Sequence, residues 1–154
     1  MKKLIIAVAA ALAAGSAHAE DDINVSALLF GASHHVNSHF GHAKGYNEVN
    51  PGLGLEAGKS WWFVGALTYR DSYYKQAYAA YAGTRYQLPI GAGFTLDAGL
   101  RLGYLNGSGW HGAMVMPSLG VSYKNVGVEM TFLPPVNSGK AKDGVLAFWL
   151  RVAF

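Results

Sequence analysis

The sequence contains no cysteine, little charge and, beyond its N-terminus, no long hydrophobic run. The absence of cysteine from all 154 residues excludes disulfide bonds and thiol chemistry. Charged residues make up only 14% of the chain and form no basic cluster that could neutralise phosphates, so nucleic acid is not an expected partner. No later stretch approaches the roughly twenty apolar residues of a membrane-spanning helix.

The first nineteen residues have the pattern of a secretory signal peptide. Met1-Lys2-Lys3 is basic, residues 4–14 are apolar, and Ala17-His18-Ala19 fits a cleavage site. The apolar run is too short for a retained membrane helix. We therefore expect residues 1–19 to be removed, which leaves 135 of the 154 residues as a single domain over residues 20–154.

What the chain does contain is alternation of apolar with small or polar residues, which is typical of β-strands. The clearest case is the C-terminal segment, whose apolar face comprises Leu146, Phe148, Leu150, Val152 and Phe154. The opposite face carries Arg151 and small residues. A hydrophobic content of 51% would also suit a secreted β-sandwich, but twenty glycines, 13% aromatics and an aromatic C-terminal residue favour an outer-membrane barrel.

Eight strand-like segments can be identified, near residues 23–35, 50–58, 60–70, 75–87, 92–104, 112–123, 125–133 and 144–154. Charged residues at alternate positions within them, such as Asp97, Arg101 and Glu129, would face a polar interior. The sequence therefore predicts an all-β fold, an eight-stranded antiparallel transmembrane β-barrel in the bacterial outer membrane. With both termini periplasmic, the four long loops would share the outer rim, at residues 36–49, 70–75, 105–111 and 134–143.

Two groups on that rim could carry chemistry. Ser33-His34-His35 is followed by His39 and His42, and Arg70-Asp71-Ser72 ends the third predicted strand. A histidine base, a carboxylate and a hydroxyl are the parts of an acyl-transfer site. A solvated polar loop is the alternative. A zinc site is weaker, because the spacing fits no standard template.

Four segments, in order along the chain, resemble the outer-membrane lipid A palmitoyltransferase (PagP) family. Tyr46-Asn47-Glu48 with Pro51-Gly52-Leu53-Gly54 resembles its Tyr-Asn-Glu motif and glycine-rich second strand. Residues 69–75 resemble its Phe-Lys-Asp-Ser-Trp-Asn-Lys, and residues 116–134 follow its sixth and seventh strands. Residues 147–154 resemble its Phe-Ala-Trp-Met-Arg-Phe-Gln-Phe ending. The resemblance covers most of residues 20–154.

The resemblance implies a catalytic set of Asp71, Ser72 and a histidine at the end of the first strand. The local pattern of a small residue, any residue and histidine favours His35. Alternation from Asn24 and Ser26 would instead favour His34, and a β-bulge would reconcile the two. We take His35 as the base, with His34 as the reserve.

The resemblance also implies a glycine on the barrel floor that measures acyl length, here Gly83, in an inward row with Ala77 and Ala79. Relief of crowding is the alternative role for this glycine. Prolines that open lateral routes for lipid in the family match Pro51, Pro117 and Pro134, whereas Ala27-Leu28 stand at the fourth such position. The family's N-terminal amphipathic helix has no counterpart, since only Glu20-Asp21-Asp22 precede the first strand.

The expected function is therefore transfer of a palmitoyl-like chain from a glycerophospholipid to lipid A, by a membrane-embedded monomer without cofactor or metal. His35 would be the general base, Asp71 would orient it, and Ser72 would stabilise the oxyanion. Tyr46, Arg70 and Lys44 would meet the acidic headgroups. The alternatives are a non-enzymatic barrel for adhesion or support, and a lipid A deacylase, whose family uses a His-x-Ser pair that this chain lacks.

Overall fold

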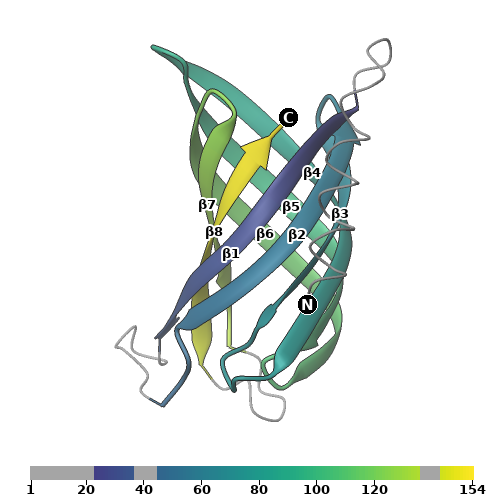
Figure 1. Ribbon diagram of the computed structural model, residues 1–154, viewed down its shortest axis with the longest axis vertical. Coiled ribbons are helices and arrows are strands. Elements are labelled where there is room, and N and C mark those ends of the chain that lie inside the picture. Colours follow the sequence, from purple (N-terminus) through teal and green to yellow (C-terminus); the bar gives the residue numbers. More distant parts are fainter. Residues whose placement is uncertain (1–22, 37–44, 136–142) are drawn as a thin grey trace, which may run out of the picture.

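The computed structural model describes residues 23–36, 45–135 and 143–154, which form one closed antiparallel barrel (Figure 1). Each strand pairs with its neighbours in sequence, and β8 closes the barrel against β1. The strands are β1 (Asn24–Val36), β2 (Val49–Lys59), β3 (Trp62–Arg70), β4 (Gln76–Gly91), β5 (Phe94–Gly107), β6 (Trp110–Tyr123), β7 (Val126–Leu133) and β8 (Gly144–Ala153). The predicted eight-stranded barrel is confirmed. The predicted signal peptide, His39, His42 and Lys44 lie outside the described residues.

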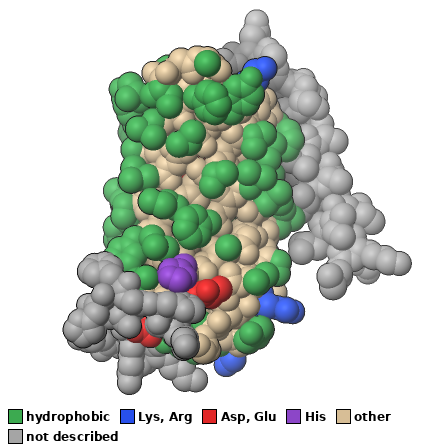
Figure 2. All heavy atoms as spheres, turned by 90° about the vertical axis from the view of Figure 1, so that its left-hand side faces the viewer, with side chains coloured by type: hydrophobic (Ala, Val, Ile, Leu, Met, Phe, Trp, Pro, Cys, Tyr) green, Lys and Arg blue, Asp and Glu red, His purple; other side chains and the backbone are tan. Residues whose placement is uncertain are grey.

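The outer face of the barrel is apolar, as the alternation predicts. On β5, Phe94, Leu96 and Leu102 are 43 to 50% exposed, whereas Asp97 and Arg101 between them are almost fully buried. Figure 2 shows apolar side chains spread over the barrel wall and charged ones near its ends. A closed barrel satisfies every ladder hydrogen bond internally, which the hydrocarbon layer requires. The chain is an outer-membrane β-barrel.

The described part of the chain contains no helix that is long and apolar enough to cross a membrane.

A charged network fills the half of the barrel nearest the short hairpins at residues 59–62, 91–94 and 123–126. Arg101 Nη2 lies 2.8 Å from Glu56 and 2.7 Å from Glu129, and Arg151 Nε donates to Glu129 at 2.8 Å. The network consists of three arginines and three carboxylates: Arg85, Arg101, Arg151, Glu56, Asp97 and Glu129. Because the two signs are balanced, these buried charges compensate one another.

An apolar layer separates this network from the opposite end of the barrel. Its buried members come from six strands, and they are Leu28, Phe63, Leu67, Ala79, Tyr81, Leu105, Met114, Met116 and Trp149. The interior therefore changes from charged to apolar along the barrel axis. The apolar layer supports the residues at the outer rim, where the connections between β1 and β2, β3 and β4, β5 and β6, and β7 and β8 meet (Figure 1).

One predicted rim loop is shorter than expected. Residues 105–111 are largely strand, because the β5–β6 ladder continues to the pair Gly107–Trp110. Only Ser108 and Gly109 form the turn, with φ values of 55° and 78°. Glycine adopts such a positive φ without steric cost, which allows the tight connection. The turn consequently brings Ser108 over the barrel mouth rather than out into a loop.

Candidate active site

A β-bulge in β1 decides which histidine faces inward. Against β8, Phe30 pairs with Trp149 and Ala32 pairs with the adjacent Phe148, so β1 carries one extra residue at Gly31. The bulge changes the inward set from even-numbered to odd-numbered positions. His35 is consequently 2% exposed, whereas 45% of the His34 side chain is exposed. The structure thus contains a bulge that reconciles the two sequence patterns and places His35 inside the barrel; its role as the base stays a prediction.

Ser72 lies in the turn that follows β3, and Asp71 builds that turn. The Asp71 carboxylate accepts backbone N–H hydrogen bonds from Tyr73 at 2.9 Å, Lys75 at 2.8 Å and Ser108 at 2.8 Å. The third bond connects the β3–β4 turn to the β5–β6 turn. Asp71 is 3% exposed, so its charge is compensated by these amides rather than by water.

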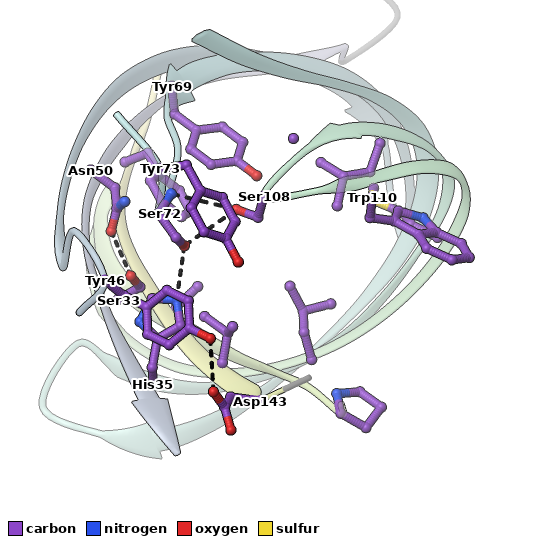
Figure 3. A pocket seen from close by; sticks show the side chains of 18 of the residues that line it. Ser33, His35, Tyr46, Asn50, Tyr69, Ser72, Tyr73, Ser108, Trp110 and Asp143 are labelled. Carbon is purple, nitrogen blue, oxygen red and sulfur yellow. Dashed lines mark hydrogen bonds between the residues drawn. The ribbon is translucent and has the colours of Figure 1, made fainter. Parts of the chain in front are cut away.

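His35 and Ser72 meet inside the barrel mouth. His35 Nε2 and Ser72 Oγ lie 2.8 Å apart, and both residues are buried (Figure 3). Ser72 Oγ also lies 3.3 Å from Ser108 Oγ. A histidine nitrogen at hydrogen-bond distance from a buried hydroxyl is the geometry of general-base catalysis. The structure therefore brings together two of the three predicted catalytic residues.

The position of Asp71 differs from the expectation that it orients His35. Among the hydrogen bonds of the described residues, none joins Asp71 to His35, because the Asp71 carboxylate is occupied by three backbone amides. The carboxylate beside His35 is instead Glu48, whose Oε1 accepts the His35 backbone N–H at 2.9 Å and lies 3.7 Å from His35 Nδ1. From the sequence, Glu48 could be identified only as part of the Tyr-Asn-Glu motif, with no predicted role of its own. Its distance of thirteen residues from His35 gave no sign of this contact.

Tyr46 covers His35 from the rim. The two rings stack with centroids 4.2 Å apart and planes 11° from parallel (Figure 3). Tyr46 Oη donates to Asp143 at 2.8 Å, so the phenol connects the segment before β2 to the start of β8. This hydrogen bond, together with burial, raises the pKa of the Tyr46 phenol, which stays protonated. The sequence placed Tyr46 at lipid headgroups, and the structure shows that it also holds the imidazole plane.

The site opens into a cavity of about 210 Å³ at the barrel mouth. Its polar lining includes His35, Ser72 and Ser108. Most of the remaining wall is apolar, and it includes Phe30, Leu105, Met114, Leu133 and Val145. A pocket that is mainly apolar with a few convergent polar groups is the usual form of a site for an apolar ligand.

Gly83 does not line this cavity. It faces inward on β4 beside Ala77 and Ala79, as expected, but a Cβ on Gly83 would lie 2.5 Å from Phe63 Cζ. The Phe63 ring in turn lies 4.5 Å from the Arg85 guanidinium, at the charged network. Gly83 therefore makes room for Phe63 deep in the barrel. Leu105 and Met114 are among the residues that limit the cavity, and the role of Gly83 in measuring acyl length stays a prediction.

Arg70 lies at the end of β3 with an exposed side chain. Its backbone carbonyl accepts a hydrogen bond from Asn50 Nδ2 at 2.9 Å, and Asn50 Oδ1 in turn accepts from Ser33 at 2.6 Å. These bonds hold β1, β2 and β3 together just below the His35–Ser72 pair. Arg70 thus has a structural backbone contact, while its guanidinium remains at the rim. Within the described residues, no cluster of three or more His, Cys, Asp or Glu side chains could hold a metal ion.

The sequence matches no protein-family model and no curated protein. Among solved structures, the chain is similar to the crystal structure of Neisserial surface protein A, with 22% sequence identity and a TM-score of 0.46. The matched region covers 86% of this chain and 97% of the Neisserial protein.

Proposed function

We propose that this outer-membrane barrel is an acyltransferase that moves a palmitoyl-like chain from a glycerophospholipid to lipid A in the outer leaflet. The observation that carries the proposal is the buried contact of 2.8 Å between His35 Nε2 and Ser72 Oγ at an apolar cavity. The family resemblance of the surrounding motifs supplies the substrate class. A purely structural rim would not require a buried histidine–serine pair beside a mainly apolar cavity.

In the proposed reaction, His35 Nε2 accepts the proton of a lipid A hydroxyl as the hydroxyl oxygen attacks the phospholipid ester carbonyl. Ser72 donates a hydrogen bond to the oxyanion that develops, and Ser108 lies close enough to position Ser72. The bond between the acyl carbon and the glycerol oxygen then breaks. The proton on His35 passes to the glycerol oxygen, so the products are a lysophospholipid and acylated lipid A.

An interrupted ladder between β6 and β7 supports entry of lipid from the membrane. The ladder stops at the pair Ser118–Thr131, and the adjacent Pro117 has no N–H. The Thr131 hydroxyl bonds to the Pro117 carbonyl instead. Val115 is 61% exposed on the outer face and nevertheless lines the cavity, so the cavity reaches the barrel wall at this point.

Mass spectrometry of lipid A tests this function directly. Cells that express the chain should gain lipid A heavier by one palmitoyl-like group, and His35→Ala and Ser72→Ala should abolish the gain. His34→Ala is the matched control, because His34 faces outward one residue away. An acyl group bound covalently to purified protein after incubation with phospholipid alone would replace the direct mechanism with an acyl-Ser72 intermediate.

A non-enzymatic outer-membrane barrel is the second candidate. The balanced charge network closes the interior and stabilises the barrel without any use of His35 or Ser72. Unchanged lipid A in cells whose outer membrane contains the folded protein would favour this candidate. Loss of one acyl chain from lipid A would instead indicate a deacylase.

A further inference from the structure

The second ring nitrogen of His35 lacks a hydrogen-bond partner among the described residues. His35 Nδ1 is buried and accepts or donates no hydrogen bond there, although its side chain is only 2% exposed. A buried polar atom without a partner costs free energy, and such atoms concentrate at functional sites. The polar side-chain atom recorded nearest to it is Glu48 Oε1, at 3.7 Å.

Glu48 is fixed beside His35 by bonds that do not involve the imidazole. Its Oε1 accepts the His35 backbone N–H at 2.9 Å, and its backbone carbonyl accepts the Ser33 N–H at 3.0 Å. Glu48 Oε1 also lies 3.3 Å from Nδ1 of the exposed His34. The carboxylate consequently needs a shift of less than 1 Å to bond His35 Nδ1. Catalytic hydrogen bonds are often this long before substrate binds.

The other ionisable groups around His35 cannot take this role. The Asp71 carboxylate already accepts three backbone amides, and Asp143 accepts the Tyr46 hydroxyl. Tyr46 stacks on the face of the imidazole rather than at Nδ1, and Tyr73 packs edge-on against Tyr46. Glu48 is therefore the carboxylate placed to bond His35 Nδ1.

We propose that Glu48 is the positioning residue of the site, which holds His35 with a proton on Nδ1, so that the unprotonated Nε2, which faces Ser72, can accept the substrate proton. This inference rests on the proposed acyl transfer. As Nε2 gains the proton of the acceptor hydroxyl, the nearby Glu48 carboxylate stabilises the imidazolium, and no proton passes to Glu48. Asp71, which the sequence analysis placed in this role, instead shapes the turn that holds Ser72.

Two measurements on Glu48→Gln test the inference, with Glu48→Asp and Asp143→Asn as companions. Gln can still accept the His35 backbone N–H but carries no charge, so the variant should fold. Its kcat should fall about 100-fold with little change in KM. Glu48→Asp should recover part of the rate, and Asp143→Asn should lose less than Glu48→Gln. An unchanged kcat in Glu48→Gln would overturn the inference.

Nuclear magnetic resonance gives a readout that does not depend on transferase activity. In refolded protein labelled with ¹⁵N-histidine and assigned with His35→Gln, the titration of His35 should move to lower pH in Glu48→Gln, because a neighbouring carboxylate favours imidazolium. Asp143→Asn should move it less. Equal shifts in both variants, or none, would overturn the role of Glu48. Another outcome would be a wild-type protein that transfers no acyl chain while the two variants still show the expected shifts in the His35 titration. In that case the proposed function would be wrong, but the coupling of Glu48 to His35 would be supported.

Discussion

At the scale of single residues, two carboxylates make different contacts in the site. Asp71 holds two turns together through backbone amides, and Glu48 lies beside the ring of His35. Both residues are acidic, but the Asp71 charge is compensated by backbone amides, whereas Glu48 lies beside an imidazole. Substitutions at Asp71 should therefore reduce stability, whereas substitutions at Glu48 should reduce activity.

Asp71→Asn should chiefly reduce stability. One carboxylate oxygen would become an amide NH₂ and could no longer accept a hydrogen bond, either from Ser108 N–H or from the pair Tyr73 and Lys75. Leaving a buried donor unpaired costs about 1–3 kcal/mol, so the free energy of unfolding in detergent micelles should fall by that amount.

Arg70→Gln is the matched control for Asp71→Asn, because Arg70 is the adjacent residue and its side chain is exposed. Its free energy of unfolding should stay within about 0.5 kcal/mol of the wild type. If Asp71→Asn were as stable as the wild type, yet shifted the His35 titration as strongly as Glu48→Gln, Asp71 would regain the orienting role.

At the scale of strands, one bulge and one proline determine where the His35–Ser72 pair and lipid would meet in the proposed reaction. The bulge at Gly31 turns His35 into the barrel, and Pro117 ends the β6–β7 ladder on the side of the cavity. In a strand, the N–H and C=O of one residue point to the same neighbour. Since the Pro117 carbonyl bonds to Thr131 on β7, the missing N–H is a donor that β7 would otherwise have received.

Pro117→Ala restores that donor, so the ladder should extend toward the rim and narrow the opening between β6 and β7. The variant should be more stable by about 1 kcal/mol, the net value of one hydrogen bond, and should acylate lipid A more slowly. Thermal unfolding and lipid A mass spectrometry measure the two effects.

Pro89→Ala provides the control for Pro117→Ala, since Pro89 lies on β4 beside the hairpin at the opposite end of the barrel. It should leave acylation unchanged. Equal or faster acylation by Pro117→Ala would show that lipid does not enter at this opening.

The strands themselves could be predicted, because a membrane-spanning strand has a recognisable alternating pattern in the sequence. Its outward residues must be apolar, and every charge between them must turn inward, as Asp97 and Glu129 do. Alternation also revealed the conflict between His34 and His35, which only a bulge resolves.

The contact of Glu48 with His35 could not be predicted, because it depends on the register of β1 against β2 and on the segment between them. Ser108 escaped notice because residues 105–111 resembled a loop rather than a tight turn. The inward direction of Gly83 follows from alternation, but its close approach to the Phe63 ring could not be predicted from it.

At the scale of the whole molecule, the barrel is stabilised by an ionic core. Glu129 contacts three arginines, at 3.0 Å from Arg85, 2.7 Å from Arg101 and 2.8 Å from Arg151. Glu129, Arg101 and Arg151 are buried, the Arg85 side chain is 12% exposed, and Arg101 lies over the Trp149 ring at 4.8 Å. Because water cannot replace a lost partner there, single changes in the network should be costly.

Glu129→Gln should lower the free energy of unfolding by about 3–5 kcal/mol, because three buried arginines would share two carboxylates. Chemical denaturation of the refolded barrel, followed by tryptophan fluorescence, measures the change. Lys124→Gln alters one charge on the exposed hairpin between β6 and β7 and should have little effect. A loss below 1 kcal/mol for Glu129→Gln would mean that the network does not stabilise the barrel.

The ionic core has a consequence for how the barrel enters the membrane. Its six members come from β2, β4, β5, β7 and β8, and Arg101 on β5 joins Glu56 on β2 to Glu129 on β7 across the interior. The β7–β8 hairpin holds one ion pair of its own, Glu129 with Arg151, but a sheet that had inserted only some of its strands would still leave other charges of the network unpaired in hydrocarbon, where an isolated charge is expensive. Complete neutralisation of the network therefore requires the closed barrel. Insertion of this protein should proceed without a long-lived partial barrel, and a hairpin truncated from the chain should remain outside the bilayer.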